Sequence, residues 1–130
     1  MGQESVRDIL IRVGDVALRA RLLDTATADK IWDALPIYSR AQIWGQEVYF
    51  STPFSAAREV DARDVVEAGE IAFWPDGDAI AIGFGPTPIS QNGEIRLASR
   101  CNVWARALDD VAALKVVQAG ERIALIEADS

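Results

Sequence analysis

Residues 8–23, DILIRVGDVALRARLL, contain the pattern that decides the fold: two runs of alternating apolar residues on either side of Gly14 and Asp15. Alternation with a period of two places the apolar side chains on one face of a β-strand. Glycine at the first turn position is typical of a two-residue type II′ turn, because that position requires a positive φ. The sequence therefore predicts a β-hairpin with an apolar face toward a core and arginines facing outward.

Two helices are expected among the strands. The pattern TATADKIWDALP predicts a helix of about ten residues, capped by Thr25 or Thr27 and ended by Pro36. Threonine suits the cap because its hydroxyl can accept from a free backbone N–H of the first turn. A second, shorter helix is expected over residues 109–117, with Asp109 as its cap.

About eight strand-like runs can be counted along the chain. Residues 52–70 interrupt them and are expected to be irregular, with at most one helical turn near residues 62–66. Many short strands with too few helices for βαβ crossovers argue against a parallel sheet. The expected fold class is mainly β, a mostly antiparallel barrel with about two helices. Besides the first hairpin, the predicted strands are IYSRAQI (37–43), EVYFS (47–51), IAFW (71–74), AIAIGF (79–84), RCNVWARAL (100–108) and ERIALIEA (121–128).

The composition is that of an ordinary globular protein, with half of the residues apolar and a quarter charged. We expect a single domain over residues 1–130, with residues 1–7 as a flexible N-terminus. The net charge of −7 and the pI near 4.5 argue against a nucleic-acid partner, because nucleic-acid-binding proteins gather Lys and Arg on one face.

The sequence also predicts a cytoplasmic location without membrane contact. The single cysteine, Cys101, cannot form an internal disulfide, and the N-terminus lacks the basic start and apolar core of a signal peptide. No apolar run approaches the roughly 20 residues that a membrane-spanning helix needs.

Three motifs resemble those of the cyclophilin-like-fold family of small prokaryotic proteins. They are a Trp-Gly-x-Glu-x-Tyr-Phe strand at 44–50, a Gly-acid-x-x-x-Trp-Pro-x-Gly hairpin at 69–77 and a Phe-Gly-x-Thr-Pro loop at 84–88. The resemblance covers about residues 9–127. It implies a closed eight-stranded barrel with a helix capping each end, and it implies no particular activity.

Cyclophilins themselves isomerise X-Pro bonds with an Arg that donates to the prolyl nitrogen, beside aromatic side chains that seat the proline ring. The resemblance implies that residues 38–40, Tyr-Ser-Arg, stand where the cyclophilin Phe-His-Arg strand falls, so Arg40 is the one residue that carries over. The alternative is that Arg40 is a solvated strand residue. Because the chain has no His and no Gln-Gly-Gly-Asp run, we expect no efficient isomerase activity.

The absence of histidine also limits other chemistry, because His is the commonest general base and the usual partner of a Ser or Cys nucleophile. Cys101 alternates with polar neighbours and is expected to be a buried, inert thiol. Clusters of His or Cys for zinc or copper are missing from the sequence. We therefore expect no metal and no cofactor.

The stretch WGQEVYFSTP, residues 44–53, concentrates polar and aromatic side chains. Strand alternation assigns Val48 and Phe50 to the core. It places Glu47, Tyr49 and Ser51 on the opposite face. A carboxylate, an aromatic ring and a hydroxyl together suit a pocket for a small polar ligand. The candidate ligand-binding residues are Arg40, Trp44, Glu47, Tyr49, Ser51, Phe84, Thr87, Ser90, Arg100 and Asn102.

Two parts of this set have alternative explanations. Prolines stiffen the loop GPTPIS, residues 85–90, so that Thr87 and Ser90 either form a binding rim or simply belong to a stable loop. Arg100 and Asn102 share one face of their strand. That face either lends polar groups to the pocket or is an outward face covered by a loop.

The leading functional hypothesis is a barrel that binds a small molecule or short peptide in a side groove formed by Arg40, Glu47, Tyr49 and the loop 85–90. The first alternative is a protein-interaction subunit with tryptophans, Trp32 or Trp104, on its partner surface. The second alternative is a weak peptidyl-prolyl isomerase.

Overall fold

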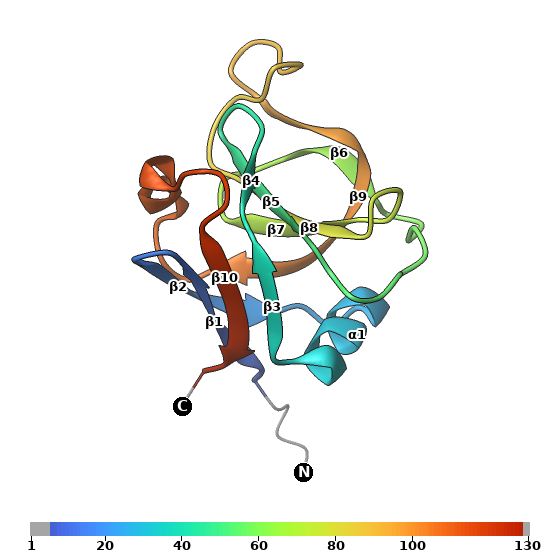
Figure 1. The fold of residues 1–130 in the computed structure, drawn as a ribbon. Coiled ribbons are helices and arrows are strands. Elements are labelled where there is room, and N and C mark those ends of the chain that lie inside the picture. The colour runs from blue at the N-terminus through green and yellow to red at the C-terminus, as the bar shows by residue number, and fades with distance from the viewer. Residues whose placement is uncertain (1–5, 129–130) are drawn as a thin grey trace.

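The structure is a computed structural model that describes residues 6–128, and it is mostly β with a nearly closed antiparallel barrel (Figure 1). The helices are α1 (Ala26–Ala34) and the 3-10 helix η1 (Val111–Val116). The strands are β1 (Asp8–Val13), β2 (Val16–Leu22), β3 (Ile37–Arg40), β4 (Gln42–Ile43), β5 (Glu47–Ser51), β6 (Arg63–Val66), β7 (Glu70–Trp74), β8 (Ala79–Gly83), β9 (Ile95–Ala107) and β10 (Arg122–Glu127).

The sheet follows the order β3-β10-β1-β2-β9-β7-β8-β5-β4, and β6 pairs with β9 beside this path. The described strand pairs are all antiparallel. The two terminal strands of the order, β3 and β4, are joined through the single residue Ala41, so the chain itself brings the ends of the sheet together. The expected mainly antiparallel barrel is confirmed, with ten strand segments in the described part of the chain rather than about eight.

The first hairpin forms as the alternation predicts. Val13 pairs with Val16 across the turn, and Gly14 has a φ of 58°. Ile9 and Ile11 are fully buried, whereas the arginines of both strands are exposed. Burying apolar strand faces contributes about 25 cal/mol per Å², so this face anchors one side of the main core.

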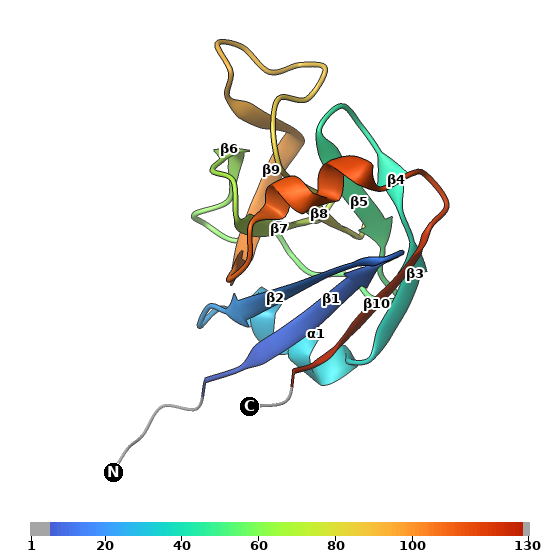
Figure 2. The same cartoon turned by 90° about the vertical axis from the view of Figure 1, so that its left-hand side faces the viewer.

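Helix α1 begins after Thr25, whose hydroxyl accepts a hydrogen bond from Ala28 N. Thr25 is therefore the cap, and Thr27 instead lies buried in the first turn. The helix buries Ala28 and Ile31 in the main core, and Ala34 is only partly buried. In Figure 2, α1 lies below the β1–β2 hairpin and η1 lies above it.

The second helix differs from the expectation in its type and its cap. It is a 3-10 helix over Val111–Val116, and Asp110 rather than Asp109 caps it by accepting from Ala112 N. Asp109 instead accepts from the backbone N of Arg19 at 2.8 Å. A second capping-competent residue directly after Asp109 moves the start of the helix by one position.

The expected flexible segment 1–7 is described only in part, because residues 1–5 lie outside the described residues. Arg7, at its end, is held in place. Its guanidinium donates to Asp29 at 2.8 Å and to the Leu23 carbonyl, and it lies 5.9 Å from the ring centroid of Trp32.

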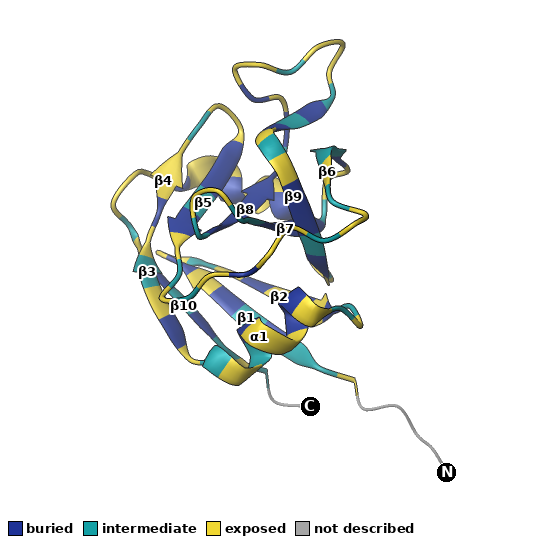
Figure 3. Cartoon of the chain, turned by 90° about the vertical axis from the view of Figure 1, so that its right-hand side faces the viewer, coloured by how far each residue is buried: buried dark blue, intermediate teal, exposed yellow. Residues whose placement is uncertain are grey.

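A second layer covers the outer face of β7 and β8. Along β8 the core side carries Ile80 and Ile82, whereas the outer side carries Ala79, Ala81 and Gly83. These small outer residues let the first half of β9 pack closely, since a Cβ on Gly83 would meet the Ile95 side chain. Figure 3 shows β6 and β9 beside β7 and β8. A smaller core of Val66, Ala72, Ile95, Leu97 and Cys101 fills the layer.

The strand β6 overturns the expectation of irregular chain with a helical turn near 62–66. Arg63 pairs with Cys101, and Val66 pairs with Ile95, although the register shifts between them. The local pattern of alternating charges and small residues hides this strand, because its ladder partners lie some thirty residues away in β9.

Strand β9 places Asn102 and Trp104 differently from the explanations that the sequence left open, which put Asn102 at the pocket or on an outward face and Trp104 on a partner surface. Asn102 and Trp104 are both fully buried, and Ala105 lies beside Trp104 in the main core. The register against β7 shifts between Ile71 and Ala72, which adds one residue to β9 at Trp104. Such a bulge breaks the strict alternation on which the sequence argument relied.

Asn102 ties three segments together. Its amide nitrogen donates to Thr27 Oγ1 and to the Ala57 carbonyl, both at 2.9 Å, and its oxygen accepts from Glu59 N at 2.8 Å. The Glu59 carboxylate in turn accepts from the hydroxyl and the backbone N of Thr27. This network joins β9, α1 and the long connection between β5 and β6.

Replacing Asn102 with alanine should therefore destabilise the protein by about 2–3 kcal/mol, because the substitution strands buried polar groups. Urea denaturation measures this change directly. A loss below about 0.5 kcal/mol, equal to that of the exposed control Gln42→Ala, would contradict the structural role assigned to Asn102.

Candidate functional site

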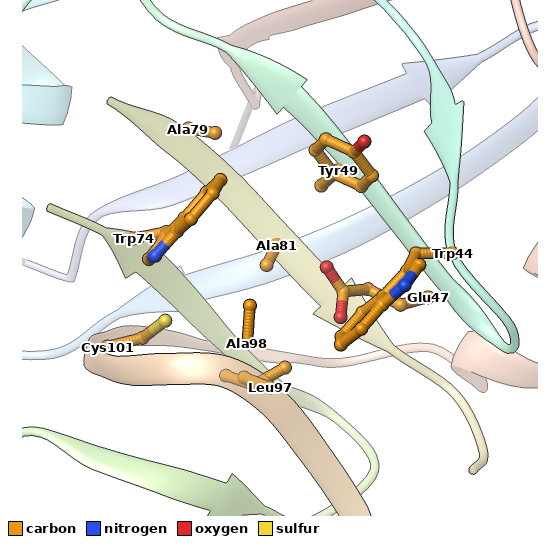
Figure 4. Close-up of a pocket in the computed structure, with 9 residues that line it drawn as sticks. All are labelled: Trp44, Glu47, Tyr49, Trp74, Ala79, Ala81, Leu97, Ala98 and Cys101. Atoms are coloured by element: carbon orange, nitrogen blue, oxygen red, sulfur yellow. The ribbon is translucent and has the colours of Figure 1, made fainter. Parts of the chain in front are cut away.

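A pocket of about 200 Å³ opens on the outer face of the barrel, between the β5–β8 strands and the first half of β9. Figure 4 shows its walls, with indole rings at two sides and alanines on the β8 floor. The residues that line the pocket are Trp44, Glu47, Tyr49, Trp74, Ala79, Ala81, Leu97, Ala98 and Cys101.

The pocket exists because large and small residues face each other across the strands. Glu47 pairs with Gly83, and Tyr49 pairs with Ala81, which lies opposite Ala72 on β7. Side chains at paired positions share a face of the sheet. Beside each large β5 side chain the neighbouring strands therefore supply only a glycine or a methyl group, and the second layer leaves the remaining space open.

The turn before β5 fixes Trp44 at the pocket. Trp44 N donates to the Glu47 carbonyl at 3.0 Å, and Gly45 adopts a φ of 59°. A Cβ on Gly45 would lie 2.9 Å from the backbone Cα of Thr87, so the loop 85–90 packs directly against this turn. Gln46 N also donates to the Pro86 carbonyl. The loop supports the turn and does not line the pocket.

The opposite wall is Trp74, at the end of β7. Its indole N–H donates to Ser99 Oγ at 2.8 Å, which fixes the ring. Ala98, next to Ser99 on β9, is exposed and lines the same pocket. The site is thus open to solvent beside Ala98. Hydrogen bonds to neighbouring residues fix the Trp74 ring and the backbone of Trp44.

Glu47 is the one ionisable carboxyl in the pocket. The residue is 5 % exposed, and its Oε1 has no hydrogen-bond partner among the described residues. Burial disfavours the charged form and raises the pKa of Glu47 to about 7. Near neutral pH the carboxyl therefore exists in both protonation states, which gives the pocket a titratable group in the physiological range.

A second buried glutamate shows what a fully satisfied carboxylate looks like in this fold. Glu70 is 2 % exposed, yet it accepts from Arg63 at 2.6 Å, from Arg106 at 3.4 Å and from Glu67 N at 2.8 Å. The hydrogen bond from Arg63 is the main cause that lowers the pKa of Glu70. Glu47 has comparable burial without any such cation.

Cys101 lies in the pocket wall as a protonated thiol. Burial, followed by the charge of Glu47, raises its pKa to about 12. Because the thiolate is the reactive form of cysteine, this thiol is a poor nucleophile at neutral pH. The expectation of a buried cysteine is confirmed.

The structure brings Trp44, Glu47 and Tyr49 together, as the sequence argument placed them. Ser51 is exposed and lies outside the pocket lining. Phe84 packs against the main core instead. The ligand-binding role of these residues remains a prediction, and only the first three share the pocket.

The two hydroxyls of the 85–90 loop are occupied within the loop. Thr87 is buried, and its hydroxyl donates to the Arg96 carbonyl. Ser90 Oγ accepts from Thr87 N at 2.8 Å and from Arg96 N at 3.0 Å. Of the two explanations left open for this loop, the geometry favours a stable loop.

Arg40 does not share a groove with Glu47 and Tyr49. It lines a separate, shallow depression on β1, β10 and β3 and donates to the Gly120 carbonyl at 3.0 Å. Arg100 is exposed and outside the pocket lining, and Asn102 points into the barrel. The expected common groove is therefore not formed, because Arg40 lines one depression and Glu47 and Tyr49 line another.

Six of the lining residues were not predicted from the sequence to belong to the site: Trp74, Ala79, Ala81, Leu97, Ala98 and Cys101. In AIAIG, residues 79–83, isoleucines alternate with small residues. This pattern indicates a strand whose small-residue face is covered by another part of the chain or by a ligand. The contribution of β9 had no local signal, because it depends on how that strand crosses the sheet. Among residues 6–128, no group of three or more His, Cys, Asp or Glu could hold a metal ion, and no helix is long and apolar enough to cross a membrane.

Replacing Glu47 with glutamine should stabilise the protein in a pH-dependent way. The raised pKa means that the folded state holds a proton which the unfolded state releases between about pH 4.5 and pH 7. Wild-type stability therefore falls across that window, by about 3 kcal/mol at most. Chemical denaturation should show a gain of about 1–3 kcal/mol for Glu47→Gln at pH 8 and little gain at pH 4.5. An equal effect at both pH values would contradict the buried, unpaired carboxyl.

Comparisons with known proteins agree with this fold. The family model described as cyclophilin-like matches residues 7–126. The solution structure of a hypothetical protein from Archaeoglobus fulgidus superimposes with a TM-score of 0.82 and 36% sequence identity, over 98% of this chain and 100% of that one. No curated protein matches the sequence. The chain therefore belongs to the cyclophilin-like family.

Proposed function

We propose that this protein binds a small molecule in the pocket between Trp44 and Trp74. The observation that carries the proposal is the carboxyl of Glu47, which is buried at an apolar, aromatic pocket and leaves one oxygen without a partner. Native proteins satisfy nearly all of their buried polar atoms, and the exceptions call for an explanation. A ligand that fills the pocket and bonds to Glu47 supplies one.

The size of the pocket favours a small molecule over a peptide. Its volume of about 200 Å³ lies below the roughly 300–1,000 Å³ of drug-sized sites. Rigid walls favour the same answer, since Trp74 is fixed by Ser99 and Trp44 by its turn. A preformed site loses little conformational entropy on binding, which helps a ligand with few atoms.

The alternative functions gain less support from the geometry. Cyclophilin chemistry needs an Arg beside the aromatic seat of the proline, and Arg40 lies in a different depression from Trp44 and Trp74. A partner surface on Trp104 is unsupported because that residue is fully buried. Trp32 is half-buried beside Arg7 and offers at most part of a ring.

Blocking the pocket mouth should abolish binding. Ala98 is exposed and lines the pocket, so Ala98→Trp places an indole at the opening without changing the core. A thermal-shift screen of small metabolites should give hits with the wild type that Ala98→Trp loses. The matched control is Ala17→Trp, at an exposed alanine of β2 that does not line the pocket. This variant should keep every hit. A screen without hits, or hits that Ala98→Trp retains, would refute the proposal.

A protease-coupled assay on an X-Pro peptide should give the rate of buffer alone, because none of the residues that line the aromatic pocket is an arginine. Arg40→Ala should change nothing in this assay. Turnover above buffer that Arg40→Ala removes would instead establish the isomerase alternative.

A further inference from the structure

We infer that the ligand of this pocket is a small protonated amine whose ammonium group binds Glu47 between the aromatic walls. This inference rests on the proposed function and specifies its ligand. It uses three features of the lining: the unpaired carboxyl oxygen, the aromatic rings and the charge of the residues around them.

The carboxyl oxygen sets the polar requirement. Glu47 Oε1 is buried without a donor in the described part of the chain, so a ligand must bring the donor with it. An ammonium group brings both N–H donors and a compensating positive charge. Hydrogen bonds between ionised partners are roughly twice as strong as neutral ones. At Glu70 the protein itself supplies cations to a buried carboxylate, whereas at Glu47 the corresponding place is the open pocket.

The aromatic walls favour the same charge. Trp44, Tyr49 and Trp74 surround the space beside the carboxylate in Figure 4. Aromatic faces attract cations, and tryptophan does so most strongly. The rest of the lining is alanine, leucine and a neutral thiol, which suits the hydrocarbon part of a small amine.

The surrounding charges are compatible with a cation and unfavourable for an anion. None of the nine lining residues is basic. The charged groups that act on the β9 wall at Cys101 are Asp64 and Asp76, with Arg58 as the single cation among them. Asp76 is paired with Arg58 and Asp64 with Arg96. An anionic ligand would therefore meet the Glu47 carboxylate in a lining that offers no basic side chain.

Proton linkage separates an amine from a neutral ligand. An ammonium ion binds the carboxylate form of Glu47, so its affinity should rise as pH rises through about 7. A neutral ligand that accepts a hydrogen bond from the protonated carboxyl should weaken over the same range. The other titratable side chains of the lining are Tyr49 and Cys101, and burial keeps the Cys101 thiol protonated throughout.

Three probes with the same ring test the inference: cyclohexylamine, cyclohexanol and cyclohexanecarboxylate. Isothermal titration calorimetry on the full chain should detect the amine, with affinity about tenfold higher at pH 8 than at pH 6, since ionisation of a carboxyl with a pKa near 7 rises by that factor. The carboxylate probe should not bind. Glu47→Gln should weaken the amine at least tenfold at pH 8 and remove its pH dependence, whereas the exposed control Glu127→Gln should change neither.

The possible outcomes also separate this inference from the proposed function. Cyclohexanol binding as tightly as the amine, with loss in Ala98→Trp, would overturn the amine inference and leave a small-molecule site in place. Absence of amine binding at pH 8 would also overturn the inference, while the metabolite screen against Ala98→Trp decides the proposed function independently. A circular-dichroism spectrum and a melting curve for each variant confirm that loss of binding is not loss of fold.

Discussion

The alternation of side chains along β5 is the constraint on which both the barrel and the site depend. Val48 and Phe50 fill the main core from one face, and Glu47 and Tyr49 face the outer layer from the other. Because the period of a strand is two, a shift of one residue would exchange the faces. The strand therefore holds its register through burial on both sides, and the same register places a carboxyl group that is only 5 % exposed in the pocket wall.

The two buried glutamates of the outer layer show how one fold treats the same side chain in two ways. Glu70 pairs with Arg63 and Arg106, which favours its charged form. Glu47 pairs with no cation among residues 6–128, and its neighbours in the pocket are rings, methyl groups and a thiol. Removing a carboxylate from water without a partner is costly. At Glu70 the two arginines offset the free-energy cost of burial, whereas at Glu47 nothing in the described chain offsets it. A ligand with a hydrogen-bond donor or a positive charge could supply that partner at Glu47.

Local patterns in the sequence were sufficient for the hairpins, for a helix start capped by one of two threonines and for the division of β5 into two faces. They failed where structure depends on distant pairing. β6 is a strand because of β9, and the bulge at Trp104 puts Ala105 in the main core beside Trp104. Arg40 and Glu47 stand seven positions apart in the sequence, yet they line different depressions. The site could be predicted from residues 44–49, whereas its far wall could not.

The pKa of the Glu47 side chain in the folded, ligand-free protein tests directly whether this carboxyl is buried without a partner. Carbon-13 NMR of the glutamate carboxyl carbons, titrated from pH 3 to pH 9 and assigned with Glu47→Gln, reports it without reference to any ligand. A carboxyl that is buried without a partner should titrate with a midpoint near 7. A midpoint near the ordinary glutamate value of about 4.3 would show a solvated or paired carboxylate and would contradict the central claim.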